Sequence, residues 1–150
     1  MTTQTTYQEN LDLPRPGTES GCDGNVDTGI VETAAGIGFG LAVGQGSGDN
    51  GVVLGGALAG FRGVSLKDAT LRPENEDKYA QYENAGVKTR GKVWVSPSES
   101  VAAGDPVHYD TTTGRFAMSG GIGPVLGARW ATSAAADGAA LVELSGYNPN

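Results

Sequence analysis

Glycine accounts for 25 of the 150 residues, and no other feature of this sequence restricts the possible folds as strongly. A glycine inside a helix costs about 1 kcal/mol relative to alanine, so a chain punctuated in this way is not expected to build long helices. Between the glycines lie short runs of β-branched and aromatic residues, most clearly across residues 86–144, as is typical of strands and turns. We therefore predict a mainly β fold, a small antiparallel β-barrel or sandwich with an extended N-terminal arm and at most one short helix.

The expected strands are short and separated by turn residues. Within residues 37–43 the apolar side chains alternate, which predicts that Phe39, Leu41 and Val43 share one face of a strand. Residues 111–114 are expected to form a tight hairpin loop. Further strands are expected at residues 30–31, 52–54, 57–66, 87–95, 106–109, 115–117, 124–131 and 139–144.

Residues 73–85 are the one fair candidate for a helix. Pro73 begins the segment, acidic residues occupy its first turn, and Gly86 follows its end, an arrangement that favours a helix. Tyr79 and Tyr82 are three residues apart and would share a helix face. The same segment could equally be an ordered polar loop.

The first 27 residues differ in composition from the rest, and we expect them to form an arm, with residues 28–150 as the β-rich domain. The arm is rich in polar residues, and its prolines favour an extended backbone. Because it offers too little apolar area to fold alone, it is either a disordered tail or an arm that orders on a neighbouring subunit, and we expect the latter. Its expected contact residues are Tyr7, Leu11, Leu13, Pro14 and Pro16.

The chain is acidic, with a formal net charge of −7 at pH 7 and a pI near 4.5. Phosphate backbones repel such a chain, so nucleic acid is not an expected partner. The single cysteine, Cys22, can form neither an internal disulfide nor a zinc site with one histidine, which fits synthesis in a reducing cytoplasm. We find no signal-peptide pattern and no apolar stretch of the roughly 18 residues that span a bilayer, so no membrane partner is expected.

One glycine pattern, Gly46-x-Gly48-x-x-Gly51, matches the dinucleotide-binding fingerprint as a string. Such a site needs a helix N-terminus after the glycines, whose free N–H groups hold the pyrophosphate. The following residues, 52–56, favour a strand instead, and Asp49 stands where a phosphate would approach. The pattern therefore predicts a loop between strands, and no cofactor is expected.

A second pattern, Asp23-x-Asn25-x-Asp27, has the first liganding positions of a calcium loop. The glycine expected at the sixth position is Thr28, and the glutamate expected at the twelfth is Ala34. Without these residues the loop neither turns sharply nor completes the oxygen shell, so no dedicated metal site is expected. We interpret the segment as a polar turn that leads out of the arm.

His108 is the only histidine, and histidine is the usual general base near neutral pH. The residue is expected on a strand, where Ser96 or Ser98 could be imagined as a nucleophile within reach. The sequence contains no G-x-S-x-G elbow or other activating context for either serine. The chain is therefore not expected to be an enzyme.

Several strand and turn segments occur in a characteristic order and spacing: Phe39–Val43 leading into Gly48–Asn50, Phe61–Val64 before Thr70–Leu71, Tyr82–Val95, Ala103–Val107 and Leu141–Leu144. Together these segments resemble the structural cement proteins of tailed bacteriophage heads. The resemblance covers residues 28–146, and the chain departs from the family's pattern in its glycine-rich stretch 51–63.

The resemblance implies a capsid decoration protein that binds the outer surface of an expanded phage head. Its implied partner is the major capsid protein, whose neighbouring subunits it would clamp, so that the shell is stabilised. It also implies association with further copies of itself, as a homotrimer or alternatively a dimer. The protein would be made in the host cytoplasm and reside on the outside of the virion, and the family offers no catalytic residues to carry over.

Aromatic side chains are common anchors of protein interfaces. Together with the arm residues, we expect Phe61, Tyr79, Tyr82 and Trp94 to contact the capsid or a neighbouring subunit. For Phe61, Trp94 and Trp130, packing in the core is the alternative. The aromatic residues also leave a second function open, that of a virion surface module that binds carbohydrate or a host surface.

Overall fold

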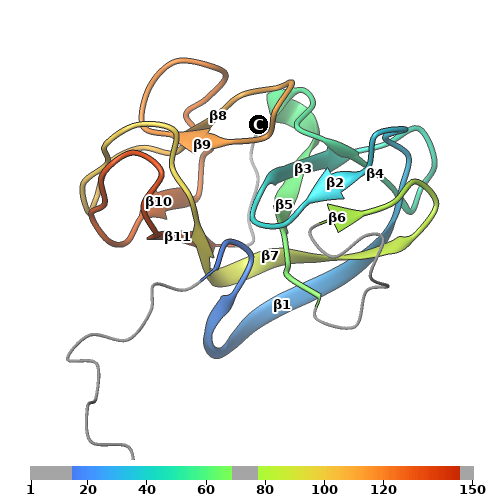
Figure 1. Cartoon of the computed structure of the whole chain (residues 1–150), viewed down its shortest axis with the longest axis horizontal. Helices are drawn as coiled ribbons and strands as arrows, with labels where there is room; N and C mark the ends of the chain where they lie inside the picture. The colour runs from blue at the N-terminus through green and yellow to red at the C-terminus, as the bar shows by residue number, and fades with distance from the viewer. Residues whose placement is uncertain (1–14, 69–77, 146–150) are drawn as a thin grey trace, which may run out of the picture.

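The computed structural model describes residues 15–68 and 78–145, and in these residues the chain is mainly β, as predicted (Figure 1). A short 3₁₀ helix, η1 (Leu58–Gly60), precedes the fifth strand. The strands of the described residues are β1 (Glu19–Val31), β2 (Ile37–Gly38), β3 (Ala42–Gln45), β4 (Gly51–Leu54), β5 (Phe61–Ser65), β6 (Lys78–Tyr79), β7 (Asn84–Val95), β8 (His108–Tyr109), β9 (Phe116–Ala117), β10 (Ala128–Trp130) and β11 (Ala140–Ser145).

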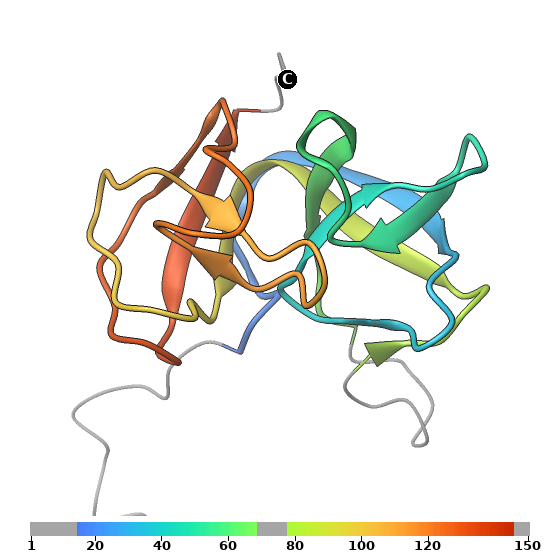
Figure 2. The ribbon, with the colours of Figure 1, turned by 90° about the horizontal axis from the view of Figure 1, so that it is seen from above.

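Strand β7 organises the main sheet, because it pairs with β1, β5 and β11. The described strands follow the order β1-β4-β3-β5-β7-β11-β10, and β1 additionally pairs with β7. This additional pairing closes β1, β4, β3, β5 and β7 into a ring of hydrogen-bonded strands, as in a small barrel. The half that contains β8–β11 lies beside the ring, and β7 runs from one half into the other (Figure 2).

The apolar side chains form two clusters that follow this division. The cluster of the ring and of strands β2 and β6 contains Val31, Ile37, Val43, Val52, Tyr79, Ala85 and Val87. The larger cluster joins β3 and β5 of the ring to the other half, and it contains Ala42, Phe61, Val64, Leu66, Val93, Val95, Val101, Val107, Tyr109, Phe116, Val125, Trp130, Ala140, Val142 and Leu144. The two halves therefore share a continuous apolar interface.

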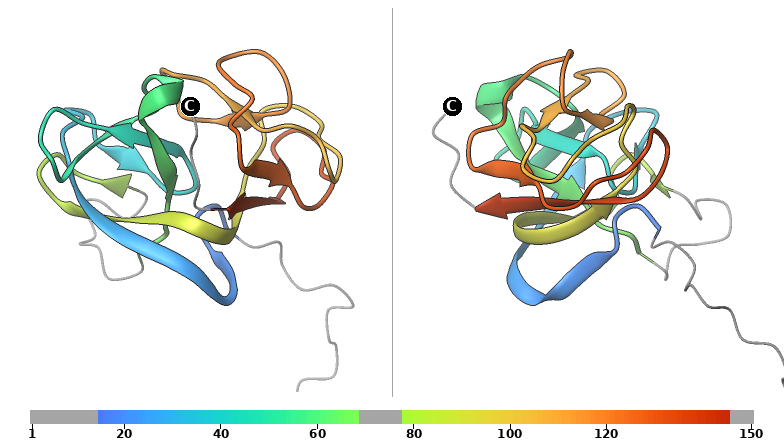
Figure 3. Two further views of the ribbon diagram at one scale, coloured as in Figure 1. Left: turned by 180° about the vertical axis from the view of Figure 1, so that it is seen from behind. Right: turned by 90° about the vertical axis from the view of Figure 1, so that its left-hand side faces the viewer.

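Strand β1 is long but bent, because its pairing with β7 shifts register on both sides of Asn25. Gly24 has a φ of 119° and lies so close to β7 that a Cβ there would collide with the carbonyl oxygen of Arg90. Only glycine fits this contact. The polar turn predicted at residues 23–27 is therefore wrong, since the segment belongs to a bent strand (Figure 3).

The bend also places part of the predicted arm in the sheet. Glu19 pairs with Val93 and Ser20 with Lys92. The contact with β7 begins at Gly17, whose amide donates to the carbonyl of Trp94 at 2.7 Å. Residues 1–14 lie outside the described residues. For them the separation into an arm and a β-rich domain stays a prediction.

Residues 37–43 do not form the one strand predicted from their alternation, because the chain turns between β2 and β3. The turn contains Gly40, whose φ of 70° favours glycine. The amide of Leu41 donates to Ser65 Oγ at 3.0 Å, which holds the turn against β5. Val43 is consequently buried in the ring cluster, whereas Leu41 is only half-buried.

The helix predicted for residues 73–85 is wrong where the structure describes it. Strand β6, a turn and the start of β7 occupy the described part, and residues 69–77 lie outside it. Tyr82 has a φ of 70°, which an α-helix does not allow. The amide of Ala80 donates to Glu83 Oε2 at 2.9 Å, so this polar segment closes a tight turn instead.

The hairpin loop predicted at residues 111–114 is confirmed and joins β8 to β9. The side chain of Asp110 shapes it, because Oδ1 accepts from the amides of Thr112 at 2.7 Å and Thr113 at 2.9 Å. These hydrogen bonds from the backbone amides, chiefly that of Thr113, lower the pKa of Asp110.

The strand predicted over residues 57–66 is confirmed only from Phe61, where β5 begins. Residues 58–60 form the 3₁₀ helix η1 instead.

We expect Trp130 to be the side chain on which the second half of the molecule depends most. It is 0% exposed, and its indole Nε1 donates to the carbonyl of Ala117 at 3.2 Å. Trp130→Ala should lower the free energy of unfolding by about 3–5 kcal/mol, measured by urea denaturation. Trp130→Phe should lie between this variant and the wild type.

Tyr82→Ala is the matched control for this prediction, because Tyr82 is 76% exposed. It should change the free energy of unfolding by no more than about 0.5 kcal/mol. A Trp130→Ala chain that is as stable as this control would contradict the central position of Trp130 in the core.

Candidate functional site

The structure does not gather the predicted contact residues into one patch. Pro16 is exposed and lies against Gly40, close to the start of the described chain. Four of the arm residues lie outside the described residues, namely Tyr7, Leu11, Leu13 and Pro14. Their contact role therefore stays a prediction.

Phe61 and Tyr79 are core residues. Phe61 is 8% exposed, and its ring centroid lies 5.4 Å from that of Tyr109. Tyr79 is 2% exposed, its hydroxyl donates to the carbonyl of Leu66 at 2.6 Å, and burial raises its pKa. Within this chain, both rings are therefore almost inaccessible to a partner protein.

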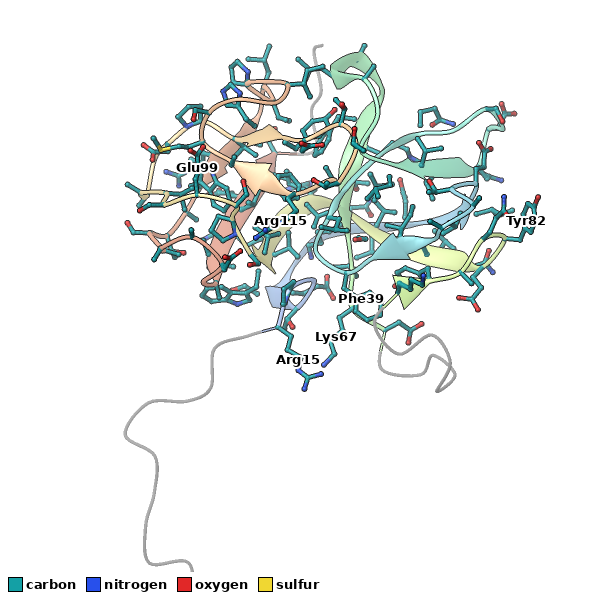
Figure 4. The ribbon with its side chains drawn as sticks, turned by 45° about the horizontal axis from the view of Figure 1, so that its top comes forward. Arg15, Phe39, Lys67, Tyr82, Glu99 and Arg115 are labelled. Carbon is teal, nitrogen blue, oxygen red and sulfur yellow. The ribbon has the colours of Figure 1, made fainter. Side chains whose placement is uncertain are left out.

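Tyr82 and Trp94 are more accessible. Tyr82 stands in the turn before β7 and projects from one end of the molecule (Figure 4). Trp94 lies on β7 opposite Leu141 and is half-buried, whereas Trp130 is fully buried. Of the predicted contact residues that the structure describes, Tyr82 has the most exposed aromatic ring.

A set of hollows that the sequence patterns did not reveal is lined by residues of β1, β5, β7, β10 and β11. These strands belong to the main sheet (Figure 3). The hollows measure about 340, 300 and 610 Å³ and share Ser145 as a lining residue. Because they share lining residues, we treat them as one surface, the sheet hollows.

The largest of the sheet hollows has a polar and partly basic lining. Cross-strand register aligns Ser20, Lys92, Glu143 and Arg129 in one row across β1, β7, β11 and β10. Arg129 Nη2 lies 2.9 Å from Glu143 Oε2, so the carboxylate of this row is already paired. Lys92 is exposed, and no ion pair or side-chain hydrogen bond of this residue occurs within the described chain.

The hollow that contains Phe61 is more mixed in character. Arg62 Nη2 lies 3.8 Å from Asp27 Oδ2, which is a long ion pair. The side chain of Arg62 is only 19% exposed. Val125 lines the apolar side, and the neighbouring Leu126 is 47% exposed. This combination suits a side chain with an apolar body and a polar end.

The signal that could have revealed these hollows is the alternation of Lys88, Arg90 and Lys92. Residues two apart on a strand point to the same face, which suggests a basic stripe. The signal is incomplete, because Lys88 is 2% exposed and its Nζ lies 2.6 Å from Glu19 Oε1. Only the tertiary structure separates the buried cation from its two exposed neighbours.

Residues 3–145 match a protein family described as structural cement protein (E217 gp24/Pam3 gp6). The chain belongs to this family of phage structural cement proteins. The resemblance read from the strand and turn segments is thereby confirmed.

Among solved structures, this cement protein is similar to a chain of the capsid of Myoviridae phage XM1, with a TM-score of 0.71 and 16% identity over 97% of this chain and 98% of that chain. The likeness is one of fold. The head fiber gp8.5 N base of bacteriophage phi29 matches with a TM-score of 0.48 and 11% identity over 84% of this chain and 98% of that chain. No curated protein matches the sequence.

In this cement protein the glycine pattern at residues 46–51 forms the predicted loop between strands β3 and β4. Its amides are occupied by Glu32, whose carboxylate accepts from Ser47 N at 2.7 Å and from Gly48 N at 2.9 Å. The amides of Gly48 and Ser47 lower the pKa of Glu32. A phosphate would have to displace this carboxylate, which argues against a nucleotide site.

A second glutamate holds a second loop in the same way. Glu99 Oε1 accepts from Met118 N at 3.0 Å, from Ser119 N at 2.8 Å and from Ser119 Oγ at 2.9 Å. The hydroxyl and amide of Ser119 are the main causes that lower the pKa of Glu99. Glu99 and Tyr82 lie at opposite ends of the molecule (Figure 4).

In the structure, the ring of His108 contacts the backbone of a loop. Its Nδ1 lies 3.0 Å from the carbonyl oxygen of Gly120, so the ring is directed to a loop backbone. The cement protein family is a structural one, which supports a non-enzymatic role. In residues 15–68 and 78–145, no group of three or more histidine, cysteine, aspartate and glutamate side chains could hold a metal, and no helix is long and apolar enough to cross a bilayer.

We expect Glu99→Gln to destabilise the chain at pH 7, because glutamine has one carbonyl acceptor in place of a charged carboxylate. The folded-state pKa of Glu99 is lowered, so its contribution is present above the unfolded pKa of about 4.3 and is lost as the pH falls through the lower folded value. The difference in urea midpoint between wild type and variant should therefore shrink between pH 7 and pH 3.

Asp49→Asn is the control for the Glu99 prediction, since it removes an exposed carboxylate from the tip of the loop at residues 46–51. Its urea midpoint should stay close to that of the wild type at both pH values. An unchanged gap between Glu99→Gln and wild type at pH 3 would show that the charge of Glu99 does not hold the loop.

Proposed function

We propose that this protein is a capsid decoration protein that binds the outer surface of an expanded phage head and clamps neighbouring major capsid protein subunits. The match of residues 3–145 to the structural cement protein family is the observation that carries the proposal. The likeness in fold to a chain of the phage XM1 capsid supports it. Synthesis in the host cytoplasm and a place on the outside of the virion are parts of the same proposal.

A clamp needs contacts with more than one coat subunit. We expect two regions of the surface to make them, one near each end of the segment from Asn84 to Lys92 of β7. Tyr82 stands just before this strand, whereas Arg90 and Lys92 lie on its second half. A strand rises about 3.3 Å per residue, so the segment from Asn84 to Lys92 separates the two regions by up to roughly 26 Å. Both regions are carried by one hydrogen-bonded sheet, so they keep a constant separation.

The stabilisation follows from mass action. A protein that binds the assembled lattice better than separate coat subunits shifts the equilibrium towards the assembled shell. Self-association, as a homotrimer or a dimer, would multiply modest contacts through a high effective concentration. An arm that supplies Tyr7, Leu11 and Leu13 from each copy would add to them.

The burial of the two tryptophans weakens the argument for the alternative function, which is binding of carbohydrate or a host surface. It depended on Trp94, Trp130 and the tyrosines as an exposed aromatic platform. Trp130 is 0% exposed and Trp94 is half-buried, so the two tryptophans do not form such a platform in this chain. We therefore do not advance this function.

The proposal is tested by co-sedimentation of the purified protein with expanded shells that lack it. The full chain should saturate the shells and raise their melting temperature in calorimetry. A chain that starts at Arg15 lacks residues 1–14 of the predicted arm but keeps β1 complete, and it should bind with lower affinity. No binding by the full chain would contradict the cement function.

The arm has its own outcome in this experiment. If the shortened chain saturates the shells at the same concentration as the full chain, the arm is not the anchor, although the clamp remains. A full chain in which Tyr7, Leu11 and Leu13 are replaced by serine separates the apolar anchors from mere length of chain.

We expect Tyr82→Ala to weaken binding to shells about tenfold or more, because an exposed aromatic ring is a common interface anchor. The melting temperature of the free protein should stay the same. Tyr79→Phe is the matched control, since it removes the buried hydrogen bond to Leu66 and should lower the melting temperature without changing shell affinity. Unchanged affinity for Tyr82→Ala would remove this residue from the interface.

A further inference from the structure

We infer that the largest of the sheet hollows, between the bend of β1 and strands β7 and β11, receives an acidic, extended segment of the coat protein. The inference rests on the proposed function and adds the chemistry of one contact. Arg90 and Lys92 would supply the charge, and Gly21 in the bend would let the segment approach the backbone closely. The hollow measures about 610 Å³.

Glycine backbone forms part of the lining of the hollow, beside the side chains of Arg90, Lys92, Glu143 and Leu144. Gly21, Gly24 and Gly91 line it and have φ values of 83°, 119° and 112°. No atom of the described chain lies within 4 Å of the place where a Cβ of Gly21 would stand, so this side of the bend is open. At Gly21 the missing side chain lets a partner chain lie close to the backbone, whereas at Gly24 it makes room for the carbonyl of Arg90.

The charges of the hollow favour an anionic partner. Arg90 and Lys92 are exposed, and neither makes an ion pair or a side-chain hydrogen bond within the described residues. The hollow's own carboxylate, Glu143, accepts from Arg129 Nε at 3.1 Å and Nη2 at 2.9 Å. The two cations next to it therefore remain available for a carboxylate from outside, which an arginine binds well with its paired N–H donors.

Most other cations of the described chain already have a partner. Arg115 pairs with Asp137 at 2.6 Å, and Lys88 with Glu19 at 2.6 Å. Lys78 donates to a backbone carbonyl at 3.0 Å.

Arg15 and Lys67 are exposed like Arg90 and Lys92, and they too make no ion pair or side-chain hydrogen bond within the described residues. The difference is that Arg90 and Lys92 line one hollow together, whereas of the other two only Lys67 lines a hollow.

An acidic protein segment fits this site better than a nucleic acid. A polymer of phosphates is attracted over many residues, and the net charge of −7 opposes it over the rest of the surface. A short segment with one or two carboxylates needs only the local field, which acts over roughly 10 Å at ordinary ionic strength.

The first experiment uses the isolated full chain and a hexaglutamate peptide as the probe, followed by NMR. Addition of the peptide should shift the amide signals of Arg90, Gly91 and Lys92 more than others, and 0.5 M salt should reverse the shifts. The Arg90→Glu/Lys92→Glu chain should show no such shifts. Equal shifts in this variant, or none in the wild type, would overturn the inference.

Lys67→Glu is the matched control, because Lys67 is exposed and lines a different hollow of about 260 Å³. It should bind the peptide as the wild type does. A single-stranded oligonucleotide is the competing probe. If it shifts the same amides at a lower concentration than hexaglutamate does, the site binds nucleic acid and the inference is wrong.

The second experiment repeats the shell co-sedimentation with the same variants. Arg90→Glu/Lys92→Glu should lose at least about tenfold in affinity for shells, whereas Lys67→Glu should lose less than about twofold. If wild type and double variant bind shells equally well, the inference fails while the cement function stands. If the wild type does not bind shells, the cement function fails, and the peptide experiment still decides whether the hollow binds carboxylates.

Discussion

The close approach of glycine backbone to both edges of β7 is the contact on which the rest of the fold depends. A Cβ at Gly63 of β5 would collide with the carbonyl oxygen of Lys88, and one at Gly24 of β1 would collide with that of Arg90. Because glycine stands at both places, β5 and β1 can pair with β7 from opposite sides and close the ring. The second half of β7 then carries β11, and through it the other half of the molecule.

This arrangement explains how a small chain with much glycine keeps a defined outline. The two halves share a cluster that contains Phe61 of the ring and Trp130 of the other half, so neither half moves freely against the other. Glu32 and Glu99 hold loops at their surfaces by accepting backbone amides. A protein that clamps a lattice needs such rigidity, because a flexible body would spend binding free energy on its own ordering.

Features that depend on neighbouring residues were predictable. The hairpin at residues 111–114 and the loop at residues 46–51 follow from turn residues between apolar runs, and both occur as expected. The segment at residues 73–85 shows where local patterns mislead, since its helix signals are real but Tyr82 takes a positive φ in a tight turn. The burial of Phe61 and Tyr79, two expected contact residues, was likewise open until their neighbours were known.

By itself, the sequence determined the mainly β fold class, because glycine content and the alternation of strand and turn residues are properties of short segments. The family followed from the order of those segments along the chain and from the match of residues 3–145. Only the tertiary structure decided that the predicted arm pairs with β7 from residue 17, and that Lys88 is buried while Arg90 and Lys92 are exposed. The physical reason is that these outcomes depend on pairing between segments more than 60 positions apart, such as Asn25 with Arg90. The local sequence of a strand does not determine which distant strand pairs with it.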